Sequence, residues 1–215
     1  MGRYDHRGNR KPRHERIKRR NLELGYYSIY TDTKKTEKSY FEGLHDSLPE
    51  EIKNKLQIKV VEDIKTKELV NKALEESGYD YQYREVWIVL DRDKVANFDN
   101  IIKKAEAKNI KVGWSNPCIE IWLHAYLGKF CAFDTSTCCC DSLKNLCRQR
   151  MNGYEYDKSD SDLYRRFYDV GSEENAIKIA KQRHASLVRD GITVPSKMNP
   201  CTTVYQLVEE IRSKI

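Results

Sequence analysis

The feature that most restricts the fold of this 215-residue chain is the alternation of strand-like and helix-like segments between residues 26 and 127. Four short segments rich in β-branched and aromatic residues each precede a segment whose apolar residues recur at helical spacing. Parallel strands need such crossovers. The pattern therefore predicts an α/β fold with a mostly parallel sheet covered by helices on both faces. The predicted strands cover residues 26–31, 58–61, 84–90 and 110–114, and the predicted helices begin near Thr36, Thr66, Asp99 and Pro117.

The last third of the chain has a different pattern. Residues 130–141 are rich in Cys, Ser and Thr and lack clear periodicity, and no strand-like segment follows them. Helical spacing returns in four segments, which predicts an α-helical C-terminal extension packed against the sheet. We expect the chain to comprise a basic arm (1–24), an α/β domain (25–128) and the extension (129–215), whose predicted helices cover residues 142–150, 160–168, 173–188 and 202–211.

Composition indicates a water-soluble, cytoplasmic protein. Charged residues make up 33% of the chain and the mean hydropathy is −0.79. No apolar run approaches the length of a membrane-spanning helix, and the basic N-terminal segment lacks the apolar stretch of a secretion signal. Seven cysteines, an odd number with three in succession, suit a reducing compartment better than a disulfide framework.

The positive charge is concentrated at the N-terminus. Residues 1–20 contain nine basic and two acidic residues, a net charge of +7, so the remaining chain carries about −1 of the total +6. Such an arm favours contact with nucleic-acid phosphates. A solvated tail that only aids solubility remains the alternative. The basic residues are Arg3, Arg7, Arg10, Lys11, Arg13, Arg16, Lys18, Arg19 and Arg20.

Acidic residues follow two of the predicted strands. Asp91 and Asp93 come directly after the apolar segment that ends at Leu90, and Asp32 follows the first strand. The carboxyl ends of parallel strands meet at one edge, where open α/β sheets bind ligands. Crowded carboxylates repel one another unless a cation lies between them, and Mg²⁺ prefers such oxygen ligands. The alternative for Asp91 and Asp93 is a polar turn without a metal.

Two polar residues lie four apart in the otherwise apolar segment 117–127, and they share one helical face. Glu120 and His124 could form a solvent-exposed stripe. Alternatively, Glu120 points towards the metal crevice, with His124 behind it or acting as a proton shuttle. Asn116, at the end of the fourth strand, would face the same crevice.

The sequence gives weak or no evidence for other kinds of metal, catalytic or nucleotide-binding site. Cys138, Cys139, Cys140 and Cys147 provide enough thiols for zinc, but their spacing matches no standard site, so we favour free or buried thiols. The chain has no nucleophile elbow and no phosphate-cradling glycine loop. It is therefore not expected to be an ATPase or a dinucleotide-dependent enzyme.

Several motifs in combination resemble the RloB-type proteins, which are bacterial abortive-infection proteins with a Toprim domain. The motifs are Ile-Tyr-Thr-Asp-Thr-x-x-Thr-Glu-x-x-Tyr-Phe at residues 29–41, Leu-Asp-Arg-Asp at 90–93 and Ser-Asn-Pro-Cys-Ile-Glu-Ile-Trp-Leu at 115–123. Residues 153–158 and 199–205 also resemble the family. The resemblance extends from about residue 25 to the end of the chain.

The resemblance implies a Toprim fold, in which a Glu ends the first strand, an Asp-x-Asp ends the third, and both handle Mg²⁺ and a phosphodiester. Where RloB-like sequences usually have Cys-Glu-Gly, this chain has Thr31, Asp32 and Thr33. Asp keeps the charge on a shorter side chain, and Thr removes the backbone freedom of glycine. Three options follow: Asp32 substitutes through a shifted metal, Glu37 reaches into the site, or the site binds without turnover.

Residues and resemblance together predict a Mg²⁺- or Mn²⁺-dependent nuclease in phage defence. Asp91 and Asp93 would hold the metal, Asp32 would be a third ligand or general base, and Glu37 and Glu120 would assist, Glu120 at a second ion. Lys34, Lys35 or Arg92 would neutralise charge on the phosphate, and Asn116, His124 and the basic arm would contact nucleic acid.

Two rival functions remain open. The Toprim site could have decayed into a nucleic-acid-binding or regulatory module, or the chain could be an effector held silent by a partner. The resemblance implies that this partner would be a P-loop ATPase encoded nearby. The nucleic acid could be DNA or RNA, including tRNA, because phosphate contacts do not distinguish them. The chain could also act as an oligomer.

Overall fold

The computed structural model describes residues 24–77, 84–93 and 95–215. The predicted basic arm, apart from Leu24, lies outside the described residues. Four parallel strands and one antiparallel strand form a single sheet in the order β2-β1-β3-β4-β5. The strands are β1 (Gly25–Thr31), β2 (Leu56–Val61), β3 (Arg84–Asp91), β4 (Lys111–Asn116) and β5 (Cys201–Thr202).

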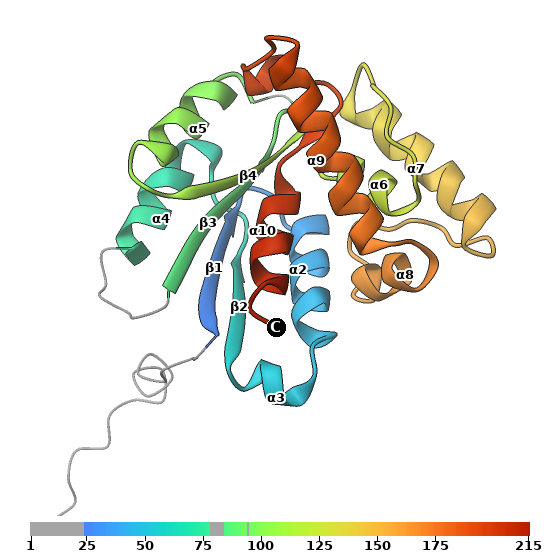
Figure 1. Ribbon diagram of the computed structural model, residues 1–215, viewed down its shortest axis with the longest axis horizontal. Coiled ribbons are helices and arrows are strands. Elements are labelled where there is room, and N and C mark those ends of the chain that lie inside the picture. Colours follow the sequence, from blue (N-terminus) through green and yellow to red (C-terminus); the bar gives the residue numbers. More distant parts are fainter. Residues whose placement is uncertain (1–23, 78–83, 94) are drawn as a thin grey trace, which may run out of the picture.

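Helices cover both faces of this sheet, as the alternating pattern predicted (Figure 1). The helix α4 (Leu69–Ser77), which follows a short 3₁₀ turn (Thr66–Glu68), and α5 (Phe98–Glu106) pack on one face. On the other face lie α2 (Thr36–Asp46) and α10 (Val204–Arg212), with α3 (Glu50–Lys53) beside β2. The mostly parallel α/β architecture is consistent with a Rossmann- or Toprim-like arrangement.

Alternation along β3 explains why the sheet has two cores. Successive side chains of a strand point to opposite faces. Trp87 and Val89 therefore enter the core on the α2 side, whereas Ile88 and Leu90 enter the core on the α4 and α5 side. A strand that is buried on both faces has an almost continuous apolar sequence.

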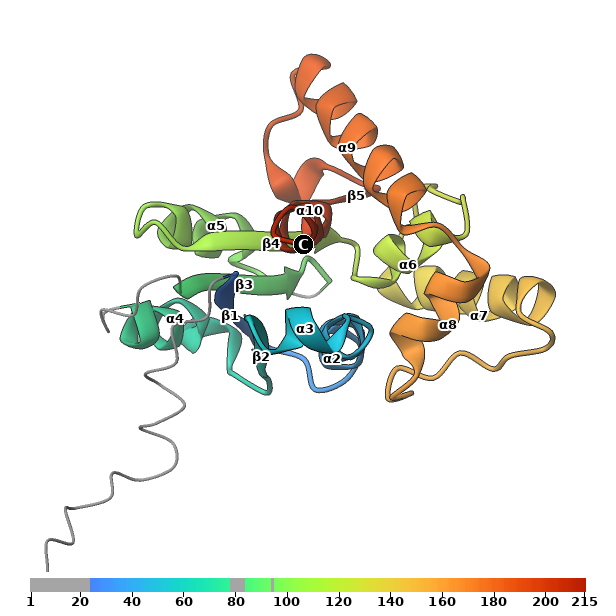
Figure 2. The same cartoon turned by 60° about the horizontal axis from the view of Figure 1, so that its bottom comes forward.

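The remaining helices stand beside the sheet, beyond the ends of its strands (Figure 2). They are α6 (Glu120–Tyr126), α7 (Ser136–Arg150), α8 (Leu163–Val170) and α9 (Glu173–Arg189). The α8 helix packs on α2, and α9 packs on both α6 and α10. The predicted extension also contributes to the sheet itself, because β5 and α10 belong to it.

Several details of the predicted C-terminal half are wrong, including the helix predicted over residues 160–168, which covers Leu163–Val170. A strand is present in this half: β5 consists of only two residues, too few to show alternation. The helix α7 begins at residue 136 rather than 142, because its buried face is built from cysteines, which pack as small apolar groups. The last helix begins at Val204 rather than at residue 202. Pro117 lies in a turn after a cis peptide bond, and α6 begins at Glu120.

All seven cysteines are free thiols, which agrees with the prediction that no disulfide framework is present. Among the described residues, no helix is both long enough and apolar enough to cross a membrane.

Candidate metal centre

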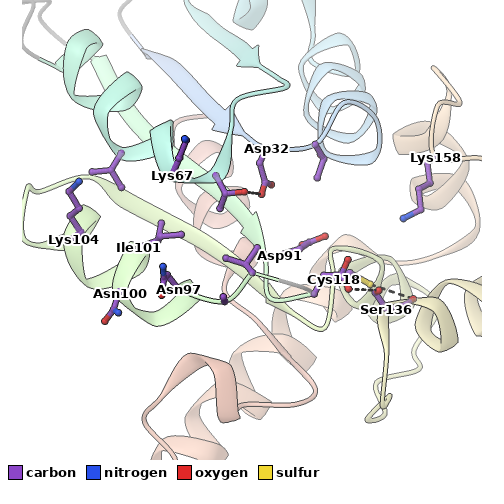
Figure 3. Close-up of a pocket in the computed structure, with 16 residues that line it drawn as sticks. Asp32, Lys67, Asp91, Asn97, Asn100, Ile101, Lys104, Cys118, Ser136 and Lys158 are labelled. Atoms are coloured by element: carbon purple, nitrogen blue, oxygen red, sulfur yellow. Dashed lines mark hydrogen bonds between the residues drawn. The ribbon is translucent and has the colours of Figure 1, made fainter.

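Two acidic residues lie where parallel strands end at one edge of the sheet. Asp91, the last residue of β3, pairs with Ser115 of β4. Thr31 at the end of β1 pairs with Val89, so Asp32 follows at nearly the level of Asp91. Figure 3 shows the side chains of Asp32 and Asp91 at the cleft between these strand ends. The register therefore brings the ends of the first and third strands to one edge of the sheet, as predicted. By strand alternation, however, Asp32 follows Tyr30 on the α4 and α5 side, whereas Asp91 follows Val89 on the α2 side.

Two glutamates approach Asp91 from the helices on its face of the sheet. Asp91 continues the alternation of Trp87 and Val89, so it points towards α2 and α6. Glu37 lies in the first turn of α2 and is 1% exposed, and Glu120 is the first residue of α6 and is 0% exposed. The alternative that Glu120 belongs to a solvent-exposed stripe is therefore wrong.

Four carboxylates at this edge each have one buried oxygen without a hydrogen-bond partner. These atoms are Oδ1 of Asp32, Oε1 of Glu37, Oδ1 of Asp91 and Oε2 of Glu120. Buried polar groups in proteins are nearly always hydrogen-bonded, and an unsatisfied charged oxygen is costly. Unpaired oxygens at one sheet edge are therefore candidate ligands for a cation.

The acids also make one another harder to ionise. Burial raises the pKa of Asp91 well above its usual range, and the negative charges of Glu37 and Glu120 raise it further. Burial likewise raises the pKa of Glu37 to about 7, with Glu120 and Asp32 adding to the effect and the Thr33 hydroxyl opposing it by donating a hydrogen bond. Burial also raises the pKa of Asp32.

Glu120 is the exception, because it has a cation of its own. Burial opposes its ionisation, but the ammonium of Lys158, 2.6 Å from Oε1, acts with hydrogen bonds from the Cys118 thiol and the backbone, and together they lower the pKa of Glu120. The Tyr156 hydroxyl donates a second hydrogen bond to Oε1 at 3.0 Å. Glu120 is thus a buried, ionised carboxylate at neutral pH.

Two cavities meet at Asp91. The larger, a cleft of about 810 Å³, contains Asp32 on one side and Asn97, Asn100 and Lys104 of the α5 region on the other. The smaller pocket, about 270 Å³, contains Glu37 and Glu120. Both cavities are lined by Thr33, Asp91 and Lys158.

The described residues form one set of three potential metal ligands whose ligand atoms all lie within 4.8 Å of one another. It consists of Cys118, Glu120 and Cys140, all buried. The Asp and Glu side chains alone do not form such a set among the described residues. The thiols suggested by the sequence, Cys138 to Cys140 with Cys147, do not converge: Cys138 is exposed and Cys147 belongs to the main core.

The other predicted residues at this edge are exposed or bonded to neighbours. Asp93 lines the cleft and accepts a hydrogen bond from Ser136 Oγ at 2.7 Å. The Arg92 guanidinium donates to the backbone carbonyls of Asp93 and Val95. Lys34 forms an exposed ion pair with Asp63. Lys35 is exposed and lines the smaller pocket.

Asn116 and His124 are directed into the protein, contrary to the predicted phosphate contacts. The Asn116 amide donates to the carbonyls of Pro195 and Ser196, and the residue is 4% exposed. His124 is completely buried, with Nε2 3.1 Å from the Cys139 carbonyl. Helical spacing placed His124 on the face of Glu120 but gave no information about α7, which covers it.

Sequence reasoning missed the residues that hold these carboxylates in place. Lys158 and Tyr156 contact Glu120, and Thr66 donates to Asp32 Oδ2 at 2.7 Å. The one available signal was the resemblance of residues 153–158 to the family. None of these contacts is local in sequence, so spacing could not reveal them.

The fold and the acidic edge together define a mostly parallel α/β protein with a candidate metal centre at the carboxyl ends of its strands. The profile of the RloB-like protein family matches residues 27–211, and the chain belongs to that family. No curated protein and no solved structure gave a match.

Proposed function

We propose that the chain is a Mg²⁺- or Mn²⁺-dependent nuclease that hydrolyses phosphodiesters of DNA or RNA in bacterial anti-phage defence. The observation that carries this proposal is the set of three carboxylates at one sheet edge, Asp32, Glu37 and Asp91, each with a buried oxygen lacking a hydrogen-bond partner. The family membership supports the defence role through the resemblance described above.

The donor set fits a hard divalent cation. Asp32, Glu37 and Asp91 offer only oxygen atoms, which Mg²⁺ and Mn²⁺ prefer. The raised pKa values of all three acids have the same origin, burial without a compensating charge. Among the described residues these acids do not form a set of three whose ligand atoms all lie within 4.8 Å, and like charges repel one another without a cation.

Each residue has a role that its position supports. Asp91, at the junction of both cavities, and Asp32, across the cleft, would hold the cation. A bound divalent ion polarises the scissile phosphate and lowers the pKa of an attacking water. Glu37, buried in the smaller pocket that Asp91 also lines, would accept the proton of that water. Lys158 lines both cavities, where its ammonium can neutralise charge on the phosphate.

In Toprim proteins a Glu ends the first strand, and this chain has no Glu at that position. Asp32 occupies that position with a shorter side chain. Glu37 is buried five residues further along, in the first turn of α2, and its negative charge acts on Asp91. This position supports the option that Glu37 reaches into the site and supplies the missing carboxylate.

The test is cleavage by the purified full chain. We expect DNA, total RNA or tRNA to be cut with Mn²⁺ or Mg²⁺ and to remain intact with a chelator. Asp91→Ala and the isosteric Asp91→Asn should abolish cleavage, whereas Asp46→Asn, an exposed acid on α2, should retain it. Cleavage that persists in both Asp91 variants would overturn the proposal.

A second candidate is a decayed Toprim site that binds nucleic acid or regulates a partner ATPase. The presence of Thr31, Asp32 and Thr33 in place of Cys-Glu-Gly favours it, as does the hydrogen bond that already ties Asp32 to Thr66. Metal-independent binding without cleavage, in the presence and absence of that ATPase, would support this candidate over the nuclease.

A further inference from the structure

Behind the acidic edge lies a cluster with different ligand chemistry. Cys118, Glu120 and Cys140 are 3%, 0% and 9% exposed, and their ligand atoms lie within 4.8 Å of one another. We propose that these three residues bind one Zn²⁺ ion, separate from the all-oxygen site at Asp32, Glu37 and Asp91. This inference does not depend on the nuclease activity proposed above.

The three ligands come from rigid and different elements. Cys118 lies in the turn after β4, where its carbonyl accepts from the Ile121 N–H at 3.0 Å. Glu120 opens α6. Cys140 lies in the second turn of α7, whose N-terminus is fixed by a hydrogen bond from the Cys138 N–H to the Thr135 hydroxyl. Such a site would join the C-terminal extension to the edge of the sheet.

The ligand types select zinc over magnesium. Thiolates are soft ligands that favour Zn²⁺, whereas Mg²⁺ and Mn²⁺ favour oxygen. Thiols bind metal ions as thiolates rather than in the protonated form. Zinc binding would therefore release protons.

The charges around the cluster suit a zinc ion. Two thiolates and one carboxylate carry three negative charges, which Zn²⁺ reduces to one. Lys158, 2.6 Å from Oε1 of Glu120, balances the remaining charge. Lys158 and Tyr156 both bond to Oε1 of Glu120, whereas Oε2 of Glu120 is buried and has no hydrogen-bond partner. Oε2 is therefore the oxygen left for the metal.

The cluster is also accessible to a metal ion. Cys118 lines the cleft of about 810 Å³, which provides an entry route (Figure 3). Three protein ligands leave one of the four positions of tetrahedral zinc open, and water from the cleft could occupy it. The site thus has the ligand number of a zinc centre that remains open to solvent.

The experiment uses the full chain, stripped of metal by a chelator and kept reduced. Zn²⁺ is titrated against a coloured competitor, and bound metal is measured by mass spectrometry. We expect about one zinc per chain in the wild type. Cys118→Ser and Cys140→Ser should each weaken zinc binding by at least about 100-fold. Cys138→Ser, an exposed neighbour on α7, is the matched control and should bind normally.

A spectroscopic measurement separates loss of a ligand from loss of fold. Co²⁺ bound to the wild type should give thiolate-to-cobalt absorption in the near ultraviolet, which should decrease in Cys118→Ser and Cys140→Ser while circular dichroism stays unchanged. Absence of tight zinc binding by the reduced wild type would overturn the proposal. Unchanged binding by both serine variants would also overturn it.

Asp91→Ala distinguishes this site from the proposed nuclease centre. The variant should lose metal-dependent cleavage and keep its zinc stoichiometry, since Asp91 is not part of the thiol cluster. A wild-type chain that cleaves nucleic acid but binds no zinc would overturn only the zinc site. The reverse result, zinc binding without cleavage, would overturn only the nuclease.

Discussion

At the scale of single residues, Glu37 is a group whose charge state would depend on a bound metal. It is 1% exposed, it lies near Asp91 and Glu120, and it has a free oxygen. Folding raises the pKa of Glu37 from 4.5 to about 7, so the folded state favours the protonated acid. A divalent cation would reverse this preference, because it stabilises the carboxylate.

The first prediction follows from the sign of that shift. Stability from Glu37 is fully present below its unfolded pKa of 4.5 and is lost as pH rises through about 7. The metal-free protein should therefore be less stable at pH 7.5 than at pH 5.5, by on the order of 1–3 kcal/mol from this group. Added Mn²⁺ should restore stability more at pH 7.5 than at pH 5.5.

Glu37→Gln and denaturant unfolding at both pH values check this prediction. Gln cannot ionise, so the variant should be more stable than the wild type at pH 7.5 without metal and should lose part of the pH dependence. Glu42→Gln, which changes an exposed residue of α2, should behave as the wild type. A pH dependence equal in wild type and Glu37→Gln would contradict the assignment.

The second prediction concerns Lys158, the cation beside buried Glu120. Lys158→Ala removes the ammonium that pairs with the Glu120 carboxylate and leaves the Tyr156 hydroxyl as a donor to Oε1. Removing one partner of a buried charge is costly, but the Lys158 side chain is 46% exposed and water can take its place, so we expect a loss of about 1–3 kcal/mol. Thermal unfolding measures this loss. Lys144→Ala removes an exposed pair with Asp141 and should change stability by less than about 0.5 kcal/mol.

At the scale of elements, the close packing of α2 on α8 holds the helix that carries Glu37. A Cβ atom at Gly43 would lie 2.6 Å from Tyr164 Cβ, which is closer than two non-bonded carbon atoms can approach. Gly43→Ala should gain about 1 kcal/mol of helix propensity. The overlap with Tyr164 should exceed this gain.

The third prediction is therefore that Gly43→Ala destabilises the protein by up to about 2 kcal/mol, because overpacking costs about 1–3 kcal/mol and the helix gain offsets about 1 kcal/mol of it. Chemical denaturation gives the value, and Glu42→Ala provides the control at an exposed site one residue earlier. A stabilised Gly43→Ala variant would show that α8 moves away from α2 without penalty.

The elements also show how much the sequence could predict. Strand and helix alternation located β1 to β4 and placed Asp32 and Asp91 at one edge, because those signals are local and periodic. The antiparallel strand β5 escaped detection, since its pairing depends on Ser115 and Thr202, which are far apart in the chain. The cluster of Cys118 with Cys140 escaped for the same reason: 22 residues and a helix separate the two thiols.

At the scale of the whole molecule, the sheet and the C-terminal extension share one core. Residues of β1, β3 and α2 pack in the same cluster as residues of α6, α7, α8 and α10. A polar network crosses this core: Glu173 of α9 accepts hydrogen bonds from Tyr126 at 2.9 Å, Tyr164 at 3.1 Å and Arg212 at 2.6 Å. Tyr126 in turn bonds to Tyr40 of α2 at 2.7 Å.

The fourth prediction is that Glu173 joins these helices into one cooperative unit. Glu173→Ala would leave the Arg212 guanidinium and two tyrosine hydroxyls without their common acceptor, so we expect a loss of about 3–5 kcal/mol. Glu174→Ala, an exposed neighbour in the same helical turn, should change stability by less than about 0.5 kcal/mol.

Near-ultraviolet and far-ultraviolet circular dichroism should report one coincident transition in the wild type. If the extension unfolded separately from the sheet, the two probes would diverge, and Glu173→Ala would shift only the earlier step. A coincident shift of both probes follows from the shared core, because neither part buries its apolar face without the other.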